Sequence, residues 1–409
     1  MNNRKSEISI IGFGTVSSIT SLILADKLIQ NDFYIKKNKS LLLELKPLSN
    51  PIVNGPTRNI EAKFISNEYL NAIPYIRNYQ SISYDENFKK YRVISGEYET
   101  ETYSIDNRIR LHCFLQEIKK SPLINLVEFD DFNDVVSNLN SNVNILGNGS
   151  YKSIFRDIEK FALQKQIKER ELFFFNLVCE KSTYNKYSGK VNIHYISDIG
   201  EILIYPFLHH TNKQTLNLTI NVIKGSKWDV FSKFNSSLLA FNLLKEILLE
   251  YIPELAKDIM ECCLAEEYFK LFKTEPYYKE AKAFYKNKLF FGIGESISKS
   301  DPLIGQGYNS GVDLSLKIID LIQMGSDSNI IDKKYSEYSQ KILEYLYHIN
   351  IASTQVSENK YLNCIYDIAV NNKNLRDLLF STFNNISNYF PWLINEEETK
   401  KMIVKYKLI

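Results

Sequence analysis

The sequence predicts an α/β fold with a parallel α/β domain, a second β-rich domain and a helical C-terminal region. A β-branched strand, a glycine-containing turn and a helix open the chain. Short apolar strands recur over residues 171–223, and helical spacing runs from Tyr308 almost to the end. The chain has 409 residues. At about 150 residues per domain, this length indicates two or three packed units.

Composition and charge exclude several classes of protein. Apolar residues make up 44% and charged residues 24%, which is typical of globular proteins and excludes disorder as the main state. The formal charge of +2 provides no overall field for nucleic acid or an anionic membrane. The apolar stretch from Ile8 to Ala25 contains glycine, serine and threonine, so it is too polar for a membrane span. We therefore expect a soluble, cytoplasmic protein without nucleic-acid or membrane partners.

Cysteine and histidine give no sign of a metal site. None of the five cysteines has the C-x-x-C spacing, so neither a disulfide framework nor a zinc site is indicated. His209 and His210 are adjacent, and neighbouring residues of a strand point to opposite faces. We therefore expect no bound metal and a reducing compartment.

The first motif follows the opening strand, Glu7–Ile11. Gly12-x-Gly14-x-x-Ser17 stands between this strand and a helix expected over Thr15–Gln30. Two glycines let the backbone turn and approach a pyrophosphate that rests on the helix N-terminus, although serine replaces the usual third glycine. A plain α/β turn is the alternative interpretation.

A second strand is expected at Leu41–Leu43, with Asn31–Lys39 as an insertion before it. Glu44 ends that strand, where an acid can accept hydrogen bonds from a ribose diol. A solvated strand end is the alternative role for Glu44. The segment Lys46–Arg58 contains three prolines and a glycine, and is expected to be a loop.

Further elements follow in chain order. We expect a helix over Arg108–Lys119, a strand over Val143–Leu146 that ends in a turn at Gly147, and a helical stretch over Trp228–Lys282. A second, mostly antiparallel sheet is expected from the strands Phe173–Val178, Val191–Ile196, Ile202–Tyr205 and Leu216–Ile223.

The most specific motif lies downstream. The strand Leu289–Ile293 is followed by Gly294 and Glu295, and then by Asp301-Pro302-x-x-Gly305-Gln306-Gly307-x-Asn309 at the start of a long helix. Such a turn exposes backbone N–H groups and the positive end of a helix dipole. It is therefore suited to stabilising negative charge on a ligand.

These motifs resemble the two-component flavoprotein monooxygenases typified by styrene and indole monooxygenase, relatives of para-hydroxybenzoate hydroxylase. The resemblance follows the chain in order: the glycine-containing start, Ile105-Asp106-Asn107-Arg108 opening a helix, the turn at Gly147, and the Gly-Gln-Gly segment. It implies a Rossmann-like FAD-binding domain, a β-rich substrate domain and a helical C-terminal region. Their expected ranges are 1–60, 105–165 and 286–330 for the first, 61–104 and 166–285 for the second, and 331–409 for the third.

The resemblance also implies roles for individual residues. Gly12, Gly14 and Thr15 would hold the FAD pyrophosphate, and Arg108 would approach the phosphates. Glu295 stands where the family has an aspartate near the ribityl chain. The remaining expected FAD contacts are Ser17, Glu44, Arg58, Asp301, Pro302, Gly305, Gln306, Gly307 and Asn309. Asn59 would lie near flavin and substrate, and Gly305, Gln306 and Gly307 would face the pyrimidine end of the isoalloxazine.

The implied activity is the transfer of one oxygen atom from O2 to a small aromatic or other electron-rich substrate, by epoxidation or hydroxylation through a flavin hydroperoxide. A separate NADH-dependent flavin reductase would supply reduced FAD, because the sequence has no second nucleotide fingerprint. Two alternatives stay open. One is a single-component NAD(P)H-dependent hydroxylase, and the other is a flavin-fold binding protein without turnover.

Two further segments have uses that the sequence leaves open. Phe173–Phe175, Tyr205–Leu208 and Leu216–Thr219 either line the substrate site or form ordinary sheet core. The C-terminal tyrosines either cover the active site, pack a homodimer or pack the core. They are Tyr335, Tyr338, Tyr345, Tyr347 and Tyr361.

Overall fold

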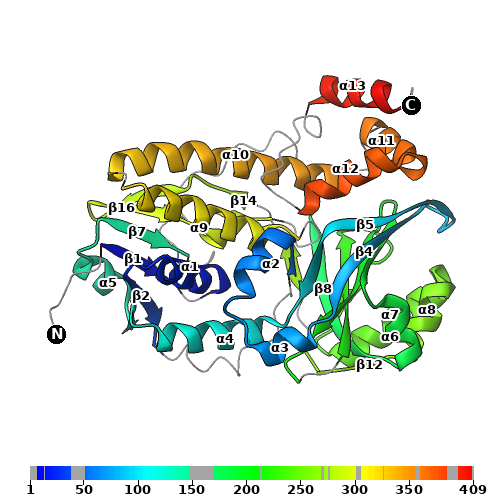
Figure 1. Ribbon diagram of the computed structural model, residues 1–409. Helices are drawn as coiled ribbons and strands as arrows, with labels where there is room; N and C mark the ends of the chain where they lie inside the picture. The colour runs from blue at the N-terminus through cyan, green and yellow to red at the C-terminus, as the bar shows by residue number, and fades with distance from the viewer. Residues whose placement is uncertain are drawn as a thin grey trace.

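The computed structural model describes residues 7–12, 14–37, 51–147, 169–211, 214–268, 271–274, 277–300, 305–325, 327–354, 360–384 and 395–407. Two large sheets dominate it, and helices pack on both (Figure 1). No helix within these ranges is both long and apolar enough to cross a membrane.

The first sheet has six strands and is almost entirely parallel. Only its edge strand β15 pairs antiparallel. β1 and β7 are buried along their whole length, as expected for a parallel sheet covered on both faces. The strands, in spatial order, are β15 (Lys282–Tyr285), β16 (Lys288–Gly292), β7 (Val143–Leu146), β1 (Ile8–Ile11), β2 (Asn31–Lys36) and β6 (Ile124–Phe129). This sheet and its helices confirm the predicted α/β class.

One face of this sheet is covered by α1 (Thr15–Asp26), which packs between α4 (Asn107–Lys120) and α9 (Gly307–Gln323). α10 (Ser328–Thr354) packs against α9, and α5 (Phe132–Asn138) precedes β7. The hydroxyl groups of α1 are not a sign of exposure, because Thr20 Oγ1 donates to Ser315 Oγ of α9 at 2.8 Å in the interior. α1 and α9 thus form one tightly joined layer.

The second strand lies earlier in the chain than the sequence analysis placed it. β2 (Asn31–Lys36) pairs in parallel with β1, so the prediction of Asn31–Lys39 as an insertion was wrong. The reason is tertiary: Asn31 is fully buried because its side chain pairs with Ser21 of α1. Leu41–Leu43 and Glu44 lie outside the described residues.

The second sheet has nine strands and is mostly antiparallel, as predicted, apart from the parallel pair β4 and β9. Its spatial order is β12 (Cys263–Leu264), β8 (Arg170–Val178), β11 (Gln214–Ile223), β10 (Gly200–Leu208), β9 (Lys190–Ile196), β4 (Tyr75–Tyr84), β5 (Lys90–Ser104) and β3 (Ile52–Val53), with β13 (Phe272–Thr274) also paired to β8. An apolar core lies between one face and the helices of this region. These helices are α6 (Lys181–Tyr187), α7 (Ser237–Tyr251), α8 (Pro253–Met260) and the 3₁₀ turn η3 (Phe231–Lys233).

Two local predictions were wrong. The helical stretch over Trp228–Lys282 ends at Met260, and the chain continues in short strands that add edges to both sheets. The expected loop before Arg58 contains the start of α2 (Gly55–Glu61), because Pro56 stands in the first helical turn and Asn54 caps it. The remaining short elements are α3 (Asn67–Ala72), β14 (Tyr277–Tyr278), β17 (Ser298–Lys299) and the 3₁₀ turn η4 (Gly294–Ser296).

A disulfide joins Cys179 to Cys262, which the cysteine spacing did not indicate. The two residues are 83 positions apart, and they meet because the end of α8 returns beside the end of β8. Cys263 follows directly and is a free, exposed cysteine. Which of the adjacent residues Cys262 and Cys263 forms the disulfide is therefore set by the fold and not by local spacing.

The C-terminal helices are α11 (Lys360–Asn371), α12 (Lys373–Asn384) and α13 (Glu396–Lys407), and they pack beside the β4–β5 hairpin (Figure 1). Tyr79 of β4 stacks on Phe380 of α12. Of the tyrosines singled out in the sequence, Tyr335, Tyr345 and Tyr347 are buried in the apolar core around the first sheet. Core packing is therefore confirmed for these three.

Candidate functional site

Three strands of the first sheet end at one edge. Gly12 follows β1 and Gly147 follows β7, while β16 ends in Gly292 with Gly294 two residues further on. Gly147 N–H donates to Ile11 O at 2.9 Å, and Ile293 N–H donates to Leu146 O at 3.0 Å. Gly12 and Gly294 have positive φ angles of 129° and 57°, which glycine adopts readily. In open α/β sheets, ligands bind outside the carboxyl ends of the strands where the strand order reverses, and β1 is such a position.

The N-terminus of α1 opens onto this edge. Gly14 is its N-cap residue, no side chain caps the helix, and its first turn contains no acidic residue. The first N–H groups of an α-helix have no partner within the helix, and the helix dipole adds positive potential there. The site is therefore suited to the pyrophosphate that the motif predicted.

Ser17, which stands in place of the motif's third glycine, joins α1 to the end of β7. Its Oγ donates to Gly147 O at 2.7 Å. A Cβ atom on Gly147 would lie 2.3 Å from the same hydroxyl and 3.1 Å from Ile293 Cγ1, so a side chain there would force its neighbours to shift. α1 and the end of β7 therefore stay close together, and the glycine at their contact is Gly147 and not the third motif position.

The Gly305–Gln306–Gly307 turn forms an open cradle. Gly305 has a φ of 62°, and a Cβ on Gly305 or Gly307 would meet nothing within 4 Å. α9 begins at Gly307 without a side-chain cap and without an acid in its first turn. The turn thus combines unhindered space with an uncapped helix N-terminus. Asp301 and Pro302 lie outside the described residues.

Asn309 ties this turn to the second sheet. Its Nδ2 donates to Gly305 O at 2.8 Å and to Ile52 O at 3.1 Å, and its Oδ1 accepts from Asn54 N–H at 3.2 Å. The side chain is 2% exposed. Since its hydrogen bonds go to protein backbone, Asn309 fixes the turn from inside.

Arg58 and Asn59 lie on α2, which Asn309 holds beside the turn. Arg58 Nη2 donates to Asn59 Oδ1 at 3.2 Å, and Arg58 Nη1 forms an ion pair with Glu101 of β5 at 3.4 Å. Asn59 is exposed and Arg58 is half-buried. The structure therefore brings α2 and the glycine turn together, and Asn59 lies on the exposed side of α2.

Glu295 lies in η4, directly after the end of β16. Its side chain is exposed, yet the surrounding protein disfavours the charged form and raises its pKa, while Lys299 acts in the opposite direction. Gly294 of η4 and Gly311 of α9 lie close to Val16 of α1. An added Cβ would lie 3.2 Å from Val16 Cγ2 at Gly294 and 2.7 Å from it at Gly311.

Arg108 has partners that the sequence did not reveal. At the start of α4, its guanidinium binds Asp106 at 2.6 Å and Glu266 at 2.9 Å. Asn176 also donates to Glu266, at 2.8 Å. Burial disfavours the charged form of Glu266, but hydrogen bonds from His209, Arg108 and Asn176 outweigh it and lower its pKa to about 2.

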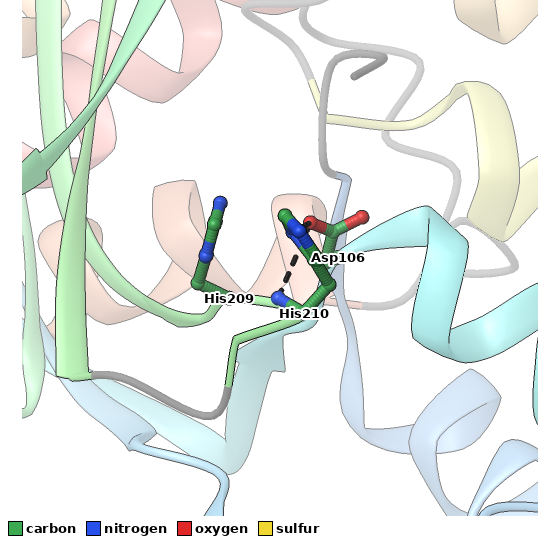
Figure 2. A group of neighbouring side chains, drawn as sticks. All are labelled: Asp106, His209 and His210. Atoms are coloured by element: carbon green, nitrogen blue, oxygen red, sulfur yellow. Dashed lines mark hydrogen bonds and ion pairs between the residues drawn. The ribbon is translucent and has the colours of Figure 1, made fainter. Parts of the chain in front are cut away.

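The sequence analysis expected His209 and His210 to point to opposite faces of a strand. In the structure their side chains lie together. β10 ends at Leu208, so the two residues follow the strand and the alternation of a strand no longer applies. Their ring centroids are 4.2 Å apart, and both rings lie beside the Asp106 carboxylate (Figure 2). Possible ligand atoms of these three residues lie within 4.8 Å of one another, which is compatible with a metal ion in spacing alone.

The hydrogen bonds of this group show another use. Both oxygens of Asp106 accept from Arg108, and His210 also contacts Asp106. These contacts lower the pKa of Asp106 despite its burial. His209 Nδ1 contacts Thr211, and its Nε2 contacts Glu266. A cation here would compete with Arg108. The group is therefore an ion-pair network that joins α4 to the second sheet.

Strand alternation sorts the residues considered for the substrate site. Phe173, Phe175, Leu216 and Leu218 point into the core beneath α7 and α8, so they are sheet core. Tyr205 and Phe207 belong to the opposite face, in a cluster that Ile52 joins. Ile52 also accepts the hydrogen bond from Asn309. This second face therefore borders the region of the Gly305–Gly307 turn.

Comparisons with known proteins show the fold. No protein-family model matches the sequence, and no curated protein matches it significantly. A flavoprotein/dehydrogenase structure from Cytophaga hutchinsonii superposes with a TM-score of 0.70 at 10% identity, covering 99% of both chains. p-Nitrophenol 4-monooxygenase PnpA from Pseudomonas putida gives 0.64 at 11% identity, covering 93% of this chain and 98% of that one.

A triple mutant of the flavin-dependent brominase Bmp2 gives a TM-score of 0.65 at 13% identity, covering 99% of this chain and 100% of that one. The halogenase PltM, solved as a mutant in complex with FAD, has the same TM-score at 11% identity. The fold of this chain is thus that of flavin-dependent monooxygenases and halogenases over nearly its whole length.

Proposed function

We propose that this chain is an FAD-dependent monooxygenase that transfers one oxygen atom from O2 to a small aromatic or other electron-rich substrate. One observation carries the proposal: the uncapped N-terminus of α1 and the open Gly305–Gly307 cradle occur together in this fold. Each offers N–H groups to a negatively charged part of a ligand, as a dinucleotide with a reducible ring system requires.

In this proposal, Gly12, Gly14 and Thr15 hold the pyrophosphate at the α1 N-terminus. Ser17 acts indirectly, because its hydroxyl is bonded to Gly147 O. Glu295 of η4, directly after the end of β16, contacts the ribityl chain. Glu44, Asp301 and Pro302 stay predicted contacts outside the described residues.

Reduced FAD, when bound, supplies the reaction with O2, in which one oxygen atom goes to the product and the other to water. The protein supplies binding, orientation and exclusion of water. Gly305 and Gly307 leave room for the ring, and the N-terminus of α9 favours negative charge beside it. Asn59, on the exposed side of α2, is the proposed polar contact near ring and substrate.

Arg108 has an indirect role in this proposal. Its guanidinium is bound to Asp106 and Glu266, so contact with a phosphate would require these ion pairs to be shared. We infer that Arg108 holds the start of α4 against the second sheet. Thr211, next to His209, extends the same network.

Three further points complete the proposal. Reduced FAD comes from a separate NADH-dependent reductase, because the sequence has one nucleotide fingerprint only. The protein acts in the cytoplasm. It acts as a monomer or a homodimer, which light scattering distinguishes.

The test starts with FAD binding, followed by absorbance during reduction and mixing with O2. NAD(P)H alone, NADH with a flavin reductase, and photoreduction are compared, so that bleaching by NAD(P)H alone identifies the single-component alternative. A panel of phenols, indoles and styrenes is then screened by mass spectrometry, with and without bromide. Incorporation of ¹⁸O from labelled O2 supports the proposal, and bromination would reassign the chain to halogenation. FAD binding without any substrate product would favour a binding protein, and absence of FAD binding would refute the assignment.

A further inference from the structure

A buried charged cluster lies next to the Gly305–Gly307 turn. It consists of Glu61 at the end of α2, Tyr103 of β5, Arg110 of α4 and Tyr308, the second residue of α9. We call it the Glu61 cluster. Glu61, Tyr103 and Arg110 are each 0% exposed, and Tyr308 is 6% exposed. Because Tyr308 directly follows Gly307, any shift of the cluster moves the turn.

The contacts converge on the carboxylate. Glu61 Oε1 accepts from Arg110 Nε at 2.9 Å and from the Tyr103 hydroxyl at 2.9 Å. The Arg110 guanidinium carbon lies 4.9 Å from the centre of the Tyr308 ring, a cation–π geometry. Arg110 also donates to Asn107 Oδ1 at the start of α4. Four elements are thereby joined behind one turn.

The charges of the cluster are balanced. Burial disfavours the charged form of Arg110, but Glu61 outweighs it, and the pKa of Arg110 is raised. Burial and Glu61 both raise the pKa of Tyr103 and of Tyr308, so both phenols stay protonated. Arg110 and Glu61 form an ion pair at 2.9 Å, in an interior where charges are weakly screened.

A buried ion pair is weak evidence of a stabilising role. Removing two charges from water costs about as much as their attraction returns, and apolar replacements are often as stable. What distinguishes this pair is its place, beside the uncapped start of α9 and the open space at Gly305 and Gly307.

We propose that Glu61 and Arg110 are positioning residues that hold the Gly305–Gly307 turn in place and, as a balanced pair, add little net electrostatic potential at the flavin ring beside it. This inference rests on the proposed FAD site. In the balanced pair, the field of Arg110 is largely cancelled by Glu61, and the helix N-terminus remains the main source of positive potential at the ring.

The proposal predicts opposite shifts in the midpoint potential of bound FAD. Glu61→Gln leaves the cation uncompensated, so it stabilises anionic reduced flavin and raises the potential. Arg110→Met leaves the carboxylate uncompensated and lowers the potential. The double variant Glu61→Gln/Arg110→Met returns toward the wild-type value. Potentials are compared at about pH 9, because a buried carboxylate without its cation has a raised pKa.

The chain contains a matched control. Arg170 and Glu201 form a buried ion pair at 2.8 Å, with 1% and 4% exposed side chains. Arg170 lies at the start of β8 and Glu201 at the start of β10. Phe207 of β10 belongs to the cluster that Ile52 joins near the glycine turn. Glu201 is six residues from Phe207, or about 20 Å along the strand at about 3.3 Å per residue. Glu201→Gln and Arg170→Met impose the same chemical changes, and they are expected to reduce stability without shifting the FAD potential.

The outcomes separate the two proposals. If wild-type protein does not bind FAD, the proposed function fails and this inference fails with it. If FAD binds but Glu61→Gln and Arg110→Met shift the potential in the same direction, or no further than the control pair does, the inference alone is overturned. Glu61→Met and Arg110→Gln make the same charge changes with different side chains, and they replace the first pair if it does not fold.

Discussion

Asn309 of α9 binds the backbone of Asn54, the residue that follows β3 of the second sheet. Its Oδ1 accepts from Asn54 N–H at 3.2 Å, while its Nδ2 donates to Gly305 O at 2.8 Å. One buried amide thereby fixes the glycine turn at the start of α9 against the start of α2. The relationship makes the turn and α2 a single unit, so substitutions in either are expected to affect the same site.

Asn309→Ala should lower both stability and FAD affinity. The substitution leaves buried backbone groups at Asn54 and Gly305 without partners, which costs about 1–3 kcal/mol. Asn31→Ala is the control, because Asn31 is also fully buried and hydrogen-bonded, to Ser21 and Ile29, at the opposite end of its strand. Urea unfolding should show losses in both variants, and FAD titration a loss in Asn309→Ala only. Equal FAD affinity in the two variants would contradict the role of Asn309.

Gly305→Val should obstruct seating of the flavin ring. Gly305 and Gly325 both have left-handed backbone, with φ of 62° and 66°, and neither has an atom within 4 Å of an added Cβ. Gly325→Val, just beyond the end of α9, therefore carries the same backbone strain away from the site. We expect FAD affinity to fall about tenfold or more, or about 1.4 kcal/mol, in Gly305→Val alone. Matching losses in both variants would show that strain, not obstruction, is responsible.

Gly147→Ala should destabilise the junction of α1 and β7. Its new Cβ would lie 2.3 Å from Ser17 Oγ and 3.1 Å from Ile293 Cγ1, an overpacking that costs about 1–3 kcal/mol. Ser17→Gly removes the first clash, so the double variant should lose less stability than the two single losses added together. Chemical denaturation of the four proteins measures this coupling. Additive losses would mean that Ser17 and Gly147 do not interact.

The sequence predicted those parts of the fold that short patterns determine. β7 and the turn before α9 lie where their residues indicated, because an apolar run or two glycines act locally. β2 was misplaced because only Phe33 and Ile35 of its six residues are buried apolar side chains, while Leu41–Leu43 is more apolar. Its position depends on Asn31 binding α1, which no local pattern contains.

The candidate site shows the same division. Gly12, Ser17, Gly305 and Gly307 stand in recognisable motifs. Glu266 and Arg108 are 158 residues apart, and nothing near Glu266 in the sequence marks it as a partner. Glu61 likewise reaches Arg110 only because α2 packs between β5 and α9. Long-range ion pairs depend on the whole topology, so a single sequence does not reveal them.

Glu266 should make stability depend on pH in the acid range. Its pKa is lowered from 4.5 to about 2 in the folded protein, so its contribution is complete above the unfolded value and is lost as pH falls from about 4.5 toward 2. The side chain is 19% exposed, and the shift corresponds to about 3 kcal/mol at neutral pH. Glu266→Gln should therefore be less stable than wild type at pH 7, with the difference shrinking between pH 4.5 and pH 3. Glu337→Gln, at an exposed position of α10, is the control. Unfolding free energies from urea titrations at each pH provide the measurement, and a difference that stays constant down to pH 3 would show that Glu266 acts through packing and not through its charge.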